Sequence, residues 1–276
     1  MRDVENFAHA LRRRRNGDGG FGPRAGQASE PEPTALAALA LEDEGARAWL
    51  ADHQGADGGF ELGVGSVVND AATGLAAIAI GPGSPRERAL DHLERRRAES
   101  IPSSPDIPHD PSVLGWGWTE DNFGWVEPTA RAVLAFRLLR PDASPFLVDG
   151  VDLLRDREAV GGGWNYGNRI VLGEELPPYV QTTAIALVAL RGLDPALEAR
   201  GLAVLANRWR GERDGGLTLA QTVVALRLYD HPDAAEAGRN LADLFATTEF
   251  LGDTVSLAWA AIAAGPAWAT LGEVTP

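Results

Sequence analysis

Two kinds of apolar segment alternate along the chain. Six segments are apolar on nearly every side, as the first of them, EPTALAALA, illustrates. A helix without a polar face has to be buried, so each of these segments predicts a buried helix. Each contains one threonine, which we expect near the helix start, where its hydroxyl can cap or bond back to the first turn. These threonines are Thr34, Thr73, Thr129, Thr183, Thr222 and Thr254.

Segments of the second kind precede the buried ones and are apolar on one side only. In the first, Phe7, Ala8 and Leu11 share one helical face, and the basic run Arg12 to Arg15 follows. This pattern predicts a half-buried outer helix. The five later segments are marked by Trp49 and Leu50; Ala89, Leu90 and Leu93; Phe146, Val151 and Leu154; Leu202, Leu205 and Trp209; and Leu241, Leu244 and Phe245.

A glycine–aromatic turn joins most amphipathic segments to the buried segment that follows, as in Gly19-Gly20-Phe21 and Gly115-Trp116-Gly117-Trp118. The repeated unit is therefore amphipathic helix, turn, buried helix. About twelve helices are expected, with the buried ones in an inner barrel and the amphipathic ones in an outer ring. An open solenoid is the alternative, but it needs polar capping repeats, and the last buried segment is among the most apolar.

No linker divides this series, so we expect a single all-α domain over residues 1–276. The longest irregular stretch, residues 99–113, contains four prolines. Prolines reduce the entropy that a loop loses when it becomes ordered. We therefore predict that this loop packs over one mouth of the barrel as a lid.

The charge and the missing residue types exclude several kinds of chemistry. With 25 basic and 39 acidic residues the formal charge is -14, which argues against a nucleic-acid partner. All basic residues are arginine, so no lysine can form a Schiff base. The chain has no cysteine, which rules out disulfides, thiol nucleophiles and thiolate-bound zinc.

Residues 254–271 carry no charge, and a stretch of this length nominally reaches that of a transmembrane span. Gly265 and Pro266 interrupt it, and it fits the sixth repeat. We interpret it as a buried helix followed by a tail, and expect no transmembrane segment. No apolar signal core precedes the first arginines, so a cytoplasmic location is expected.

Several of the repeated phrases resemble a known family. The segment Gln54 to Phe60 has the form Q-x3-G-x-aromatic, and Glu158 to Trp164 repeats it with glutamate in place of glutamine. With VEPTARAVLAF and the GWGW turn, this is similar to the repeat of squalene–hopene cyclases and the prenyltransferase/squalene oxidase repeat family. The resemblance covers essentially the whole chain. It implies an (α/α)6 toroid, an apolar central cavity whose mouth is ringed by inner-helix starts, and a hydrophobic small-molecule substrate.

The departures from that family concern its chemistry. Its class II terpene cyclases protonate an alkene or epoxide with a D-x-D-D-T-A motif. The nearest match, Glu30-Pro31-Glu32-Pro33-Thr34-Ala35, has proline in place of the last aspartate. The large cyclases have two such domains, which makes a second chain supplying a missing domain a candidate partner. The zinc site of the family's protein prenyltransferases needs a cysteine, so neither a metal nor another cofactor is expected.

Four acidic residues lie at or just before the expected inner-helix starts: Glu32, Asp70, Glu127 and Asp253. Each can be explained as a cap or a dipole partner, worth roughly 0.3–1 kcal/mol. As a set, they would surround one mouth, where like charges beside an apolar cavity can leave one carboxyl protonated. Glu127, with Glu32 or Asp70 nearby, is therefore the candidate catalytic acid. We expect it at the mouth, close to Trp125 and another acid.

Six aromatic residues cluster in two of the connectors. One explanation is that they brace helices, because aromatic side chains mostly supply core area. The other is a wall of rings that binds substrate and stabilises a carbocation, with Trp125 the best placed to reach the cavity. The candidate substrate-binding residues are Trp116, Trp118, Phe123, Trp125, Trp164 and Tyr166.

These observations favour a terpene-cyclase-like enzyme that acts on an isoprenoid or similar hydrophobic substrate by protonation from a carboxylic acid. One alternative is a non-catalytic toroid that binds a lipid or a partner peptide. Another is a carbohydrate-active enzyme on the same barrel, with paired carboxylates flanking a sugar. Fold-level resemblance does not choose among these activities.

Overall fold

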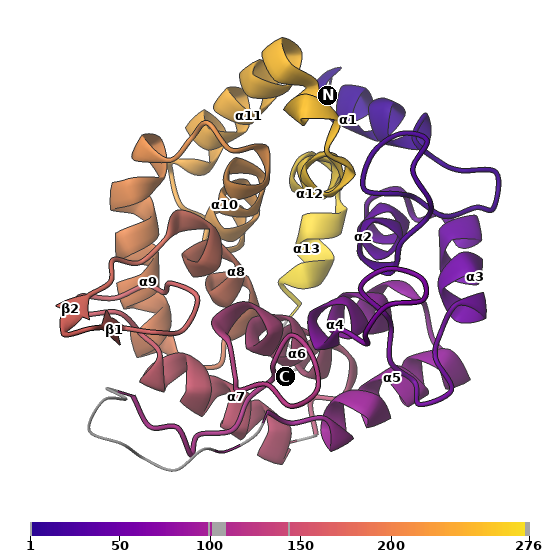
Figure 1. The fold of residues 1–276 in the computed structure, drawn as a ribbon. Coiled ribbons are helices and arrows are strands. Elements are labelled where there is room, and N and C mark those ends of the chain that lie inside the picture. Colours follow the sequence, from indigo (N-terminus) through magenta and orange to yellow (C-terminus); the bar gives the residue numbers. More distant parts are fainter. Residues whose placement is uncertain (1, 99, 101–108, 143, 274–276) are drawn as a thin grey trace.

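Two concentric rings of helices make up the structure, a computed structural model that describes residues 2–98, 100, 109–142 and 144–273. Within these residues the chain forms thirteen α-helices and one short hairpin of strands. Six helices line the inside of the ring and six surround them (Figure 1). The predicted all-α toroid is therefore confirmed.

The inner ring is closed. Each inner helix packs against the next one along the chain, and the last, α12, packs against the first, α2. An open solenoid is thereby excluded. Neighbours cover these helices on all sides, which is why their sequences lack a polar face. The inner helices are α2 (Pro31–Leu41), α4 (Asp70–Ala79), α6 (Val126–Leu139), α8 (Val180–Leu190), α10 (Gly216–Leu228) and α12 (Thr254–Ala264).

Each outer helix packs mainly against the inner helix that precedes it in the chain, and α1 packs against α12. The compact hairpin is therefore inner helix then outer helix, whereas the sequence suggested the reverse order. The N-terminal helix completes the outer ring against the last inner helix. The outer helices are α1 (Arg2–Arg12), α3 (Glu44–Asp52), α5 (Ser84–Arg95), α7 (Ser144–Asp156), α9 (Pro195–Arg208) and α11 (Ala234–Thr248). A 3-10 turn, η1 (Trp209–Gly211), follows α9, and another, η2 (Glu249–Gly252), follows α11.

Threonine hydroxyls attach the glycine–aromatic turns to four inner helices. In α6, Thr129 Oγ1 accepts a hydrogen bond from the N–H of Trp116 at 3.0 Å. The carbonyl of Trp116 accepts the N–H of Trp125, the residue before the helix. The aromatic side chain is thus fixed in the core by its own backbone. The same threonine bond recurs between Thr34 and Phe21, Thr73 and Phe60, and Thr183 and Trp164.

The other two threonines do not occupy this position. Thr222 lies two turns into α10 and donates to the carbonyl of Thr218 in its own helix. Thr254 is the first residue of α12. The expected equivalence therefore holds for four repeats and is wrong for two. In the fifth repeat the turn carries Leu217 in place of an aromatic residue, so the aromatic backbone that a threonine would hold is missing.

Glycine in these turns allows the backbone to approach the next outer helix. Gly58 has a φ of +90°, and a Cβ atom there would lie 2.2 Å from the carbonyl oxygen of Arg88 in α5. Gly162 has a φ of +107°, and its Cβ would lie 3.0 Å from the carbonyl oxygen of Arg200 in α9. Both the conformation and the contact therefore exclude a larger residue.

Replacing Thr129 by valine is expected to lower the free energy of unfolding by about 1–3 kcal/mol, because it leaves the buried N–H of Trp116 without a partner. Thr222→Val is the matched control and should have a much smaller effect, since Thr222 bonds only within its own helix. Urea unfolding of the two variants measures the difference. Equal losses would show that the hydroxyl of Thr129 does not hold the turn.

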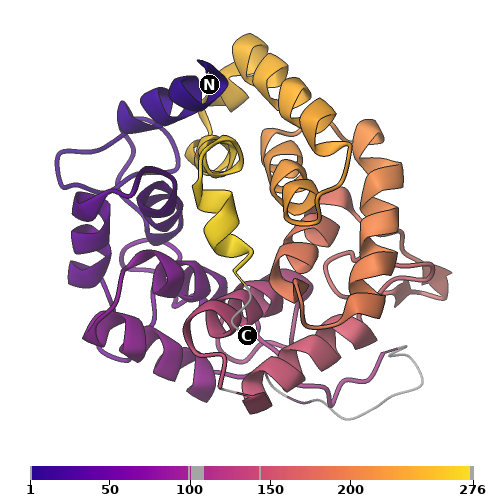
Figure 2. The same ribbon diagram turned by 180° about the vertical axis from the view of Figure 1, so that it is seen from behind.

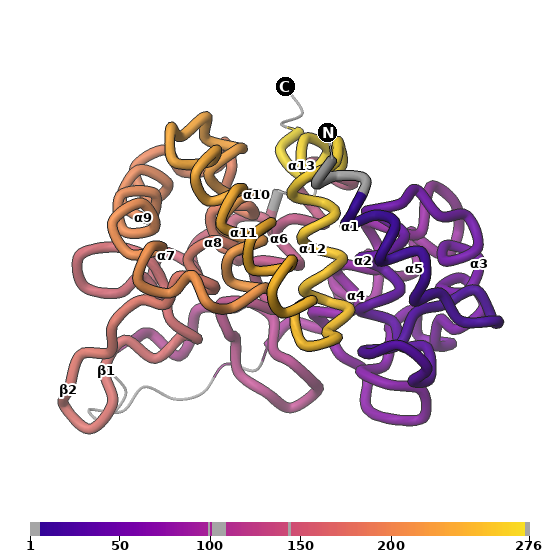
Figure 3. The backbone as a smooth tube through the Cα atoms, turned by 90° about the horizontal axis from the view of Figure 1, so that it is seen from above, coloured from indigo at the N-terminus to yellow at the C-terminus, as the bar shows by residue number. Residues whose placement is uncertain are grey.

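The two ends of the barrel differ. At the end where the inner helices finish, the short helix α13 (Ala267–Leu271) lies across the centre of the ring (Figures 2 and 3). Buried Arg137 of α6 donates to the carbonyl oxygens of Val188 and Ala189 in α8 and of Leu271 in α13. Burial lowers the pKa of Arg137 to about 10. The arginine thus ties α13 across this mouth.

The opposite end, where the inner helices begin, carries the connectors. It includes an unpredicted hairpin of β1 (Ile170–Val171) and β2 (Glu174–Glu175), visible in Figure 3. Most of the predicted lid lies outside the described residues. Its described end lies against the outer ring, where the N–H of Asp110 donates to Asp156 of α7. Among the described helices, none is long and apolar enough to cross a membrane.

Candidate functional site

The six inner helices start in one register, set by their first helical hydrogen bond. In each, the fourth residue donates its N–H to the carbonyl of the residue before the helix, as Thr34 does to Glu30 and Leu219 does to Gly215. Residues with the same ordinal number therefore hold the same place within their own helices. The second residues are Glu32, Ala71, Glu127, Gln181, Leu217 and Val255, and the sixth residues are Leu36, Leu75, Arg131, Ile185, Gln221 and Trp259.

A salt bridge crosses the barrel at this end. Arg131 Nη2 lies 2.6 Å from Glu127 Oε1 in the same helix and 2.7 Å from Glu32 Oε1 in α2. Helices α2 and α6 are not neighbours, because α4 lies between them. The bridge therefore runs through the interior of the barrel. The side chain of Glu32 is 21% exposed, that of Glu127 9% and that of Arg131 3%, so the group leads from solvent into the core.

The charges in this group do not balance. Burial alone would lower the pKa of Arg131, but the negative charges of Glu32 and Glu127 outweigh burial and raise it above its ordinary value. Arg131 is therefore a permanent cation. Two glutamates face this one guanidinium. The group then carries one excess negative charge.

A third carboxyl lies just outside the group. Glu30 precedes α2 and makes no side-chain capping bond. Partial burial, followed by the negative charge of Glu32, raises the pKa of Glu30 above its ordinary value. Of the three acids at this mouth, Glu30 is the one whose surroundings favour the protonated form.

Asp70 and Asp253 do not join this group, although the sequence suggested that all four acids converge. Asp70 is the first residue of α4, and one residue corresponds to about 100° of rotation about a helix. Its Oδ1 lies 3.4 Å from Nε2 of His92 in α5, so it faces the outer ring. Asp253 caps α12 by accepting the N–H of Ser256. Glu32 and Glu127 are the two that meet.

Two of the six candidate aromatic residues belong to the core. Trp116 and Trp164 are fully buried, and their indole N–H groups donate to the carbonyls of Leu93 and Leu154 at the ends of outer helices. Their bonds brace the rings together, so no face is left for a substrate.

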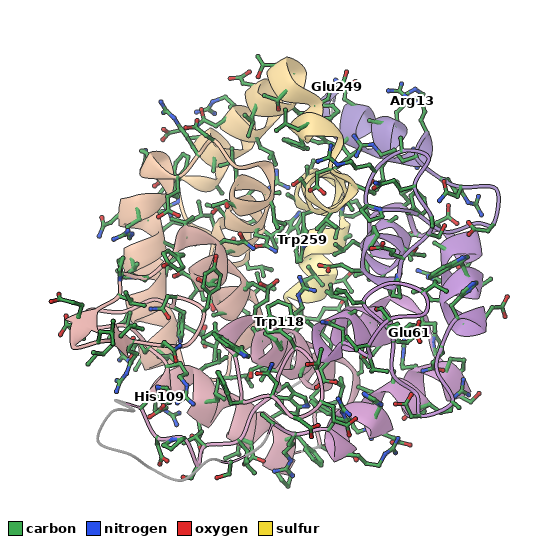
Figure 4. The ribbon with its side chains drawn as sticks, viewed as in Figure 1. Arg13, Glu61, His109, Trp118, Glu249 and Trp259 are labelled. Atoms are coloured by element: carbon green, nitrogen blue, oxygen red, sulfur yellow. The ribbon has the colours of Figure 1, made fainter. Side chains whose placement is uncertain are left out.

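The other four aromatic candidates are partly or largely exposed in connectors at the mouth. Phe123 and Trp125 pack with ring centroids 4.9 Å apart, and the indole of Trp125 donates to Asn122. Tyr166 packs against Tyr179, the residue before α8, at 5.1 Å. Trp118 lies toward the inner side of the ring in Figure 4, and its carbonyl accepts the N–H of Asp70. These residues form an aromatic rim over α6 and α8.

Sequence reasoning missed Arg131, although a signal was present. A charged residue in the middle of an otherwise apolar helix needs a buried partner, and Glu127 stands one turn before it. The sequence pattern could therefore have paired these two residues. It could not have brought Glu32 to them, because that contact spans 99 positions. Among the residues described, no group of three His, Asp or Glu side chains could hold a metal ion.

Comparisons with known proteins bear on the fold. No protein-family model matches the chain, and no curated protein matches its sequence. A solved protein from Actinoplanes shares 18% identity with a TM-score of 0.59, over 99% of both chains. The type II terpene cyclase MstE from Scytonema, solved with the product merosterolic acid A, shares 18% identity with a TM-score of 0.56, over 89% of this chain and 78% of that one. MstE solved with its substrate geranylgeranyl dihydroxybenzoate shares 17% identity with a TM-score of 0.54, over 89% of this chain and 77% of that one. At these identities the likeness establishes a terpene-cyclase-like toroid and leaves the activity open.

Proposed function

We propose that the chain takes a hydrophobic, isoprenoid-like molecule into the barrel through the mouth at Glu32 and Glu127 and acts on it as a class II terpene-cyclase-like enzyme. The observation that carries this proposal is the Glu32–Arg131–Glu127 bridge. It places charged groups inside a barrel whose helices are otherwise almost wholly apolar. Buried ionic groups are costly to maintain, and catalysis on a bound apolar substrate is a use that accounts for them.

Exposed apolar side chains at the same end support a hydrophobic ligand. Nine of the ten large apolar residues that are exposed among the described residues lie in connectors, most of them leading to inner-helix starts. They lie at the end of the ring that carries the connectors and are spread from the second repeat to the sixth. They are Leu62, Val64, Val67, Phe123, Val160, Tyr166, Val171, Leu172 and Leu251.

The three carboxyls would divide the chemistry between them. Glu30, with its raised pKa, would supply the proton. Its O–H bond breaks as a C–H bond forms on the substrate, and the alkene electron pair is consumed. Glu32 and Glu127 would then stabilise the resulting cation. A second alkene of the same molecule attacks this cation, so that its electron pair forms the ring C–C bond and the positive charge moves to the next carbon. Loss of a proton from a carbon beside that charge to a carboxylate then restores an alkene, and the product is a cyclised isomer of the substrate. This assigns the proton to Glu30, and not to Glu127 as the sequence suggested.

The test is incubation with geranylgeraniol and with its terminal epoxide, followed by a gas-chromatographic search for cyclised isomers of unchanged mass. We expect an isomer from at least one probe and its loss in Glu30→Gln, with the melting temperature nearly unchanged because Glu30 makes no capping bond. Glu44→Gln, on the exposed outer helix α3, is the control. Full turnover by Glu30→Gln would remove the acid assignment. Binding without any isomer would favour the second candidate.

Glu127→Gln gives a separate prediction. It removes one of the two carboxylates that Arg131 contacts while Glu32 remains, so we expect a loss of about 1–3 kcal/mol in the free energy of unfolding. Isomer formation should fall as well, because one stabilising charge is lost. Chemical denaturation and the isomer assay measure the two effects. A destabilised yet fully active variant would show that Glu127 is only structural.

The second candidate is a non-catalytic toroid that binds a hydrophobic molecule. Its support is that the acid motif of class II cyclases is incomplete here, because Pro33 stands where the last aspartate of that motif would be. The carbohydrate-active alternative has less support. Trp116 and Trp164 are buried and bonded to the backbone, so neither can stack on a sugar.

A further inference from the structure

Five buried polar atoms on three inner helices have no hydrogen-bond partner among the described residues. They are Nε and Nη1 of Arg131, Nε2 and Oε1 of Gln221, and Nε1 of Trp259. The three residues are 3%, 0% and 1% exposed. Buried polar groups are nearly always paired in folded proteins, and each one left unpaired costs about 1–3 kcal/mol. Such a concentration therefore needs a reason.

The three residues share the same place on their helices. Each is the sixth residue of its inner helix, in the register described above. Helix α12 stands opposite α6 in the ring, and α10 lies next to α12. Arg131 lies inside the barrel because its bridge to Glu32 crosses the interior, and Figure 4 shows Trp259 on the side of α12 toward the ring centre. Val223 of α10 lines a pocket with Phe7 of α1 and Leu241 of α11 in the outer ring. Gln221 stands about 200° around α10 from Val223, so it faces inward.

The chemistry of the five atoms selects one kind of partner. Four of them are N–H donors, and Oε1 of Gln221 is the acceptor. Donors could hold an anion, but Glu32 and Glu127 already exceed the charge of Arg131. A further negative charge beside them would be repelled. A neutral oxygen group avoids this repulsion: a carbonyl accepts from the donors, and a hydroxyl also donates to Oε1. The remaining sixth residues, Leu36, Leu75 and Ile185, are apolar and suit the body of a hydrophobic molecule.

We propose that Arg131, Gln221 and Trp259 bind the neutral oxygen group, a hydroxyl or carbonyl, of the hydrophobic molecule that enters the barrel. This inference rests on the proposed function and specifies which end of the ligand lies deepest. The oxygen group lies beside Arg131, one helical turn further along α6 than Glu127. The apolar chain then extends back toward the mouth, past Glu32 and Glu127.

The experiment compares three probes with one saturated skeleton: phytanol, phytanic acid and phytane. Saturation prevents any cyclisation, so binding is measured apart from turnover. Each probe is delivered on cyclodextrin, and the amount that elutes with the protein is measured by gas chromatography. We expect the wild-type protein to prefer phytanol to phytane by about tenfold, the equivalent of one hydrogen bond to a buried site. Phytanic acid should bind more weakly than phytanol.

Gln221→Leu and the near-isosteric Gln221→Met should both reduce the preference for phytanol over phytane to about twofold or less. Binding of phytane itself should not decrease. Without ligand, both variants should melt at or above the wild-type temperature, because an unpaired buried amide has been removed. Gln27→Leu, on the exposed first turn, is the control and should keep the wild-type preference.

The outcomes separate this inference from the proposed function. If phytanol and phytane bind equally well to the wild type, or if the Gln221 variants keep the preference, the oxygen site is wrong while hydrophobic binding stands. A lower melting temperature in Gln221→Met would show that internal packing or buried water already satisfies the amide, and would also overturn the site. If none of the three probes binds, the proposed function fails along with it.

Discussion

Replacing Arg131 by methionine is expected to lower the free energy of unfolding by about 3–5 kcal/mol, the usual loss when one partner of a buried ion pair is removed. Arg131 is 3% exposed and is the cation shared by Glu32 and Glu127. Without it, two carboxylates face each other inside an apolar barrel. Urea unfolding near neutral pH measures the loss.

Arg140→Met is the matched control for this experiment. Arg140 directly follows α6 and contacts Glu87, Asp91 and Glu94 on α5, but these acids are largely or partly exposed. Solvent-exposed ion pairs contribute about 0–1 kcal/mol each, so the control should lose far less stability. Losses of equal size would show that Arg131 is not a buried partner.

The loss in Arg131→Met should also depend on pH. Burial without a cation raises the pKa of a carboxyl above its value in the unfolded chain. A group with a raised folded-state pKa carries no penalty below the unfolded pKa, near 4.3 for glutamate, and destabilises as the pH rises through the folded pKa. The difference between wild type and variant should therefore grow from pH 4 to pH 8. Adding Glu127→Gln to Arg131→Met should reduce this pH-dependent difference in unfolding free energy.

Trp164→Ala should lower the free energy of unfolding by a similar amount, about 3–5 kcal/mol, because it empties a large site in the core. The ring of Trp164 is fully buried, and its indole N–H donates to the carbonyl of Leu154 at 2.7 Å. Gly201 in α9 packs so closely that a Cβ there would lie 2.6 Å from the ring. Thermal and urea unfolding provide the measurement.

Trp125→Ala separates the core role from the ligand role. Trp125 is only partly buried and bonds to Asn122 at the mouth. Its loss should cost about 1 kcal/mol or less, as for most changes outside the core. Phytanol retention should fall several-fold in Trp125→Ala, and folded Trp164→Ala should retain phytanol as the wild type does. The reverse pattern would show that Trp164 contacts ligand and that Trp125 only supports the fold.

The sequence by itself predicted six buried and six amphipathic helices in a double ring, but not the thirteenth helix, α13. The spacing of apolar residues was enough for this prediction, because a helix such as α8, which has no polar side, has to be buried inside a ring of other helices. The sequence also placed Glu32 and Glu127 at one mouth of the barrel, and both contact Arg131 there. These properties follow from the spacing of apolar and acidic residues within each helix, which can be read from the sequence.

Tertiary structure decided which side chains meet. Asp70 is the first residue of its helix, whereas Glu32 and Glu127 are the second residues of theirs. This difference of one residue rotates the side chain by about 100° about the helix axis and directs Asp70 to His92 in the outer ring. The position of Thr222 was predicted wrongly, because α10 begins at Gly216 and Thr222 lies three residues further into its helix than Thr34 does. Arg131 finds Glu32 only because the ring closes and brings α2 and α6 to the same interior. Spacing along the chain defines the faces of each helix, but contacts across a barrel depend on the relative rotation of helices far apart in sequence, which packing alone sets.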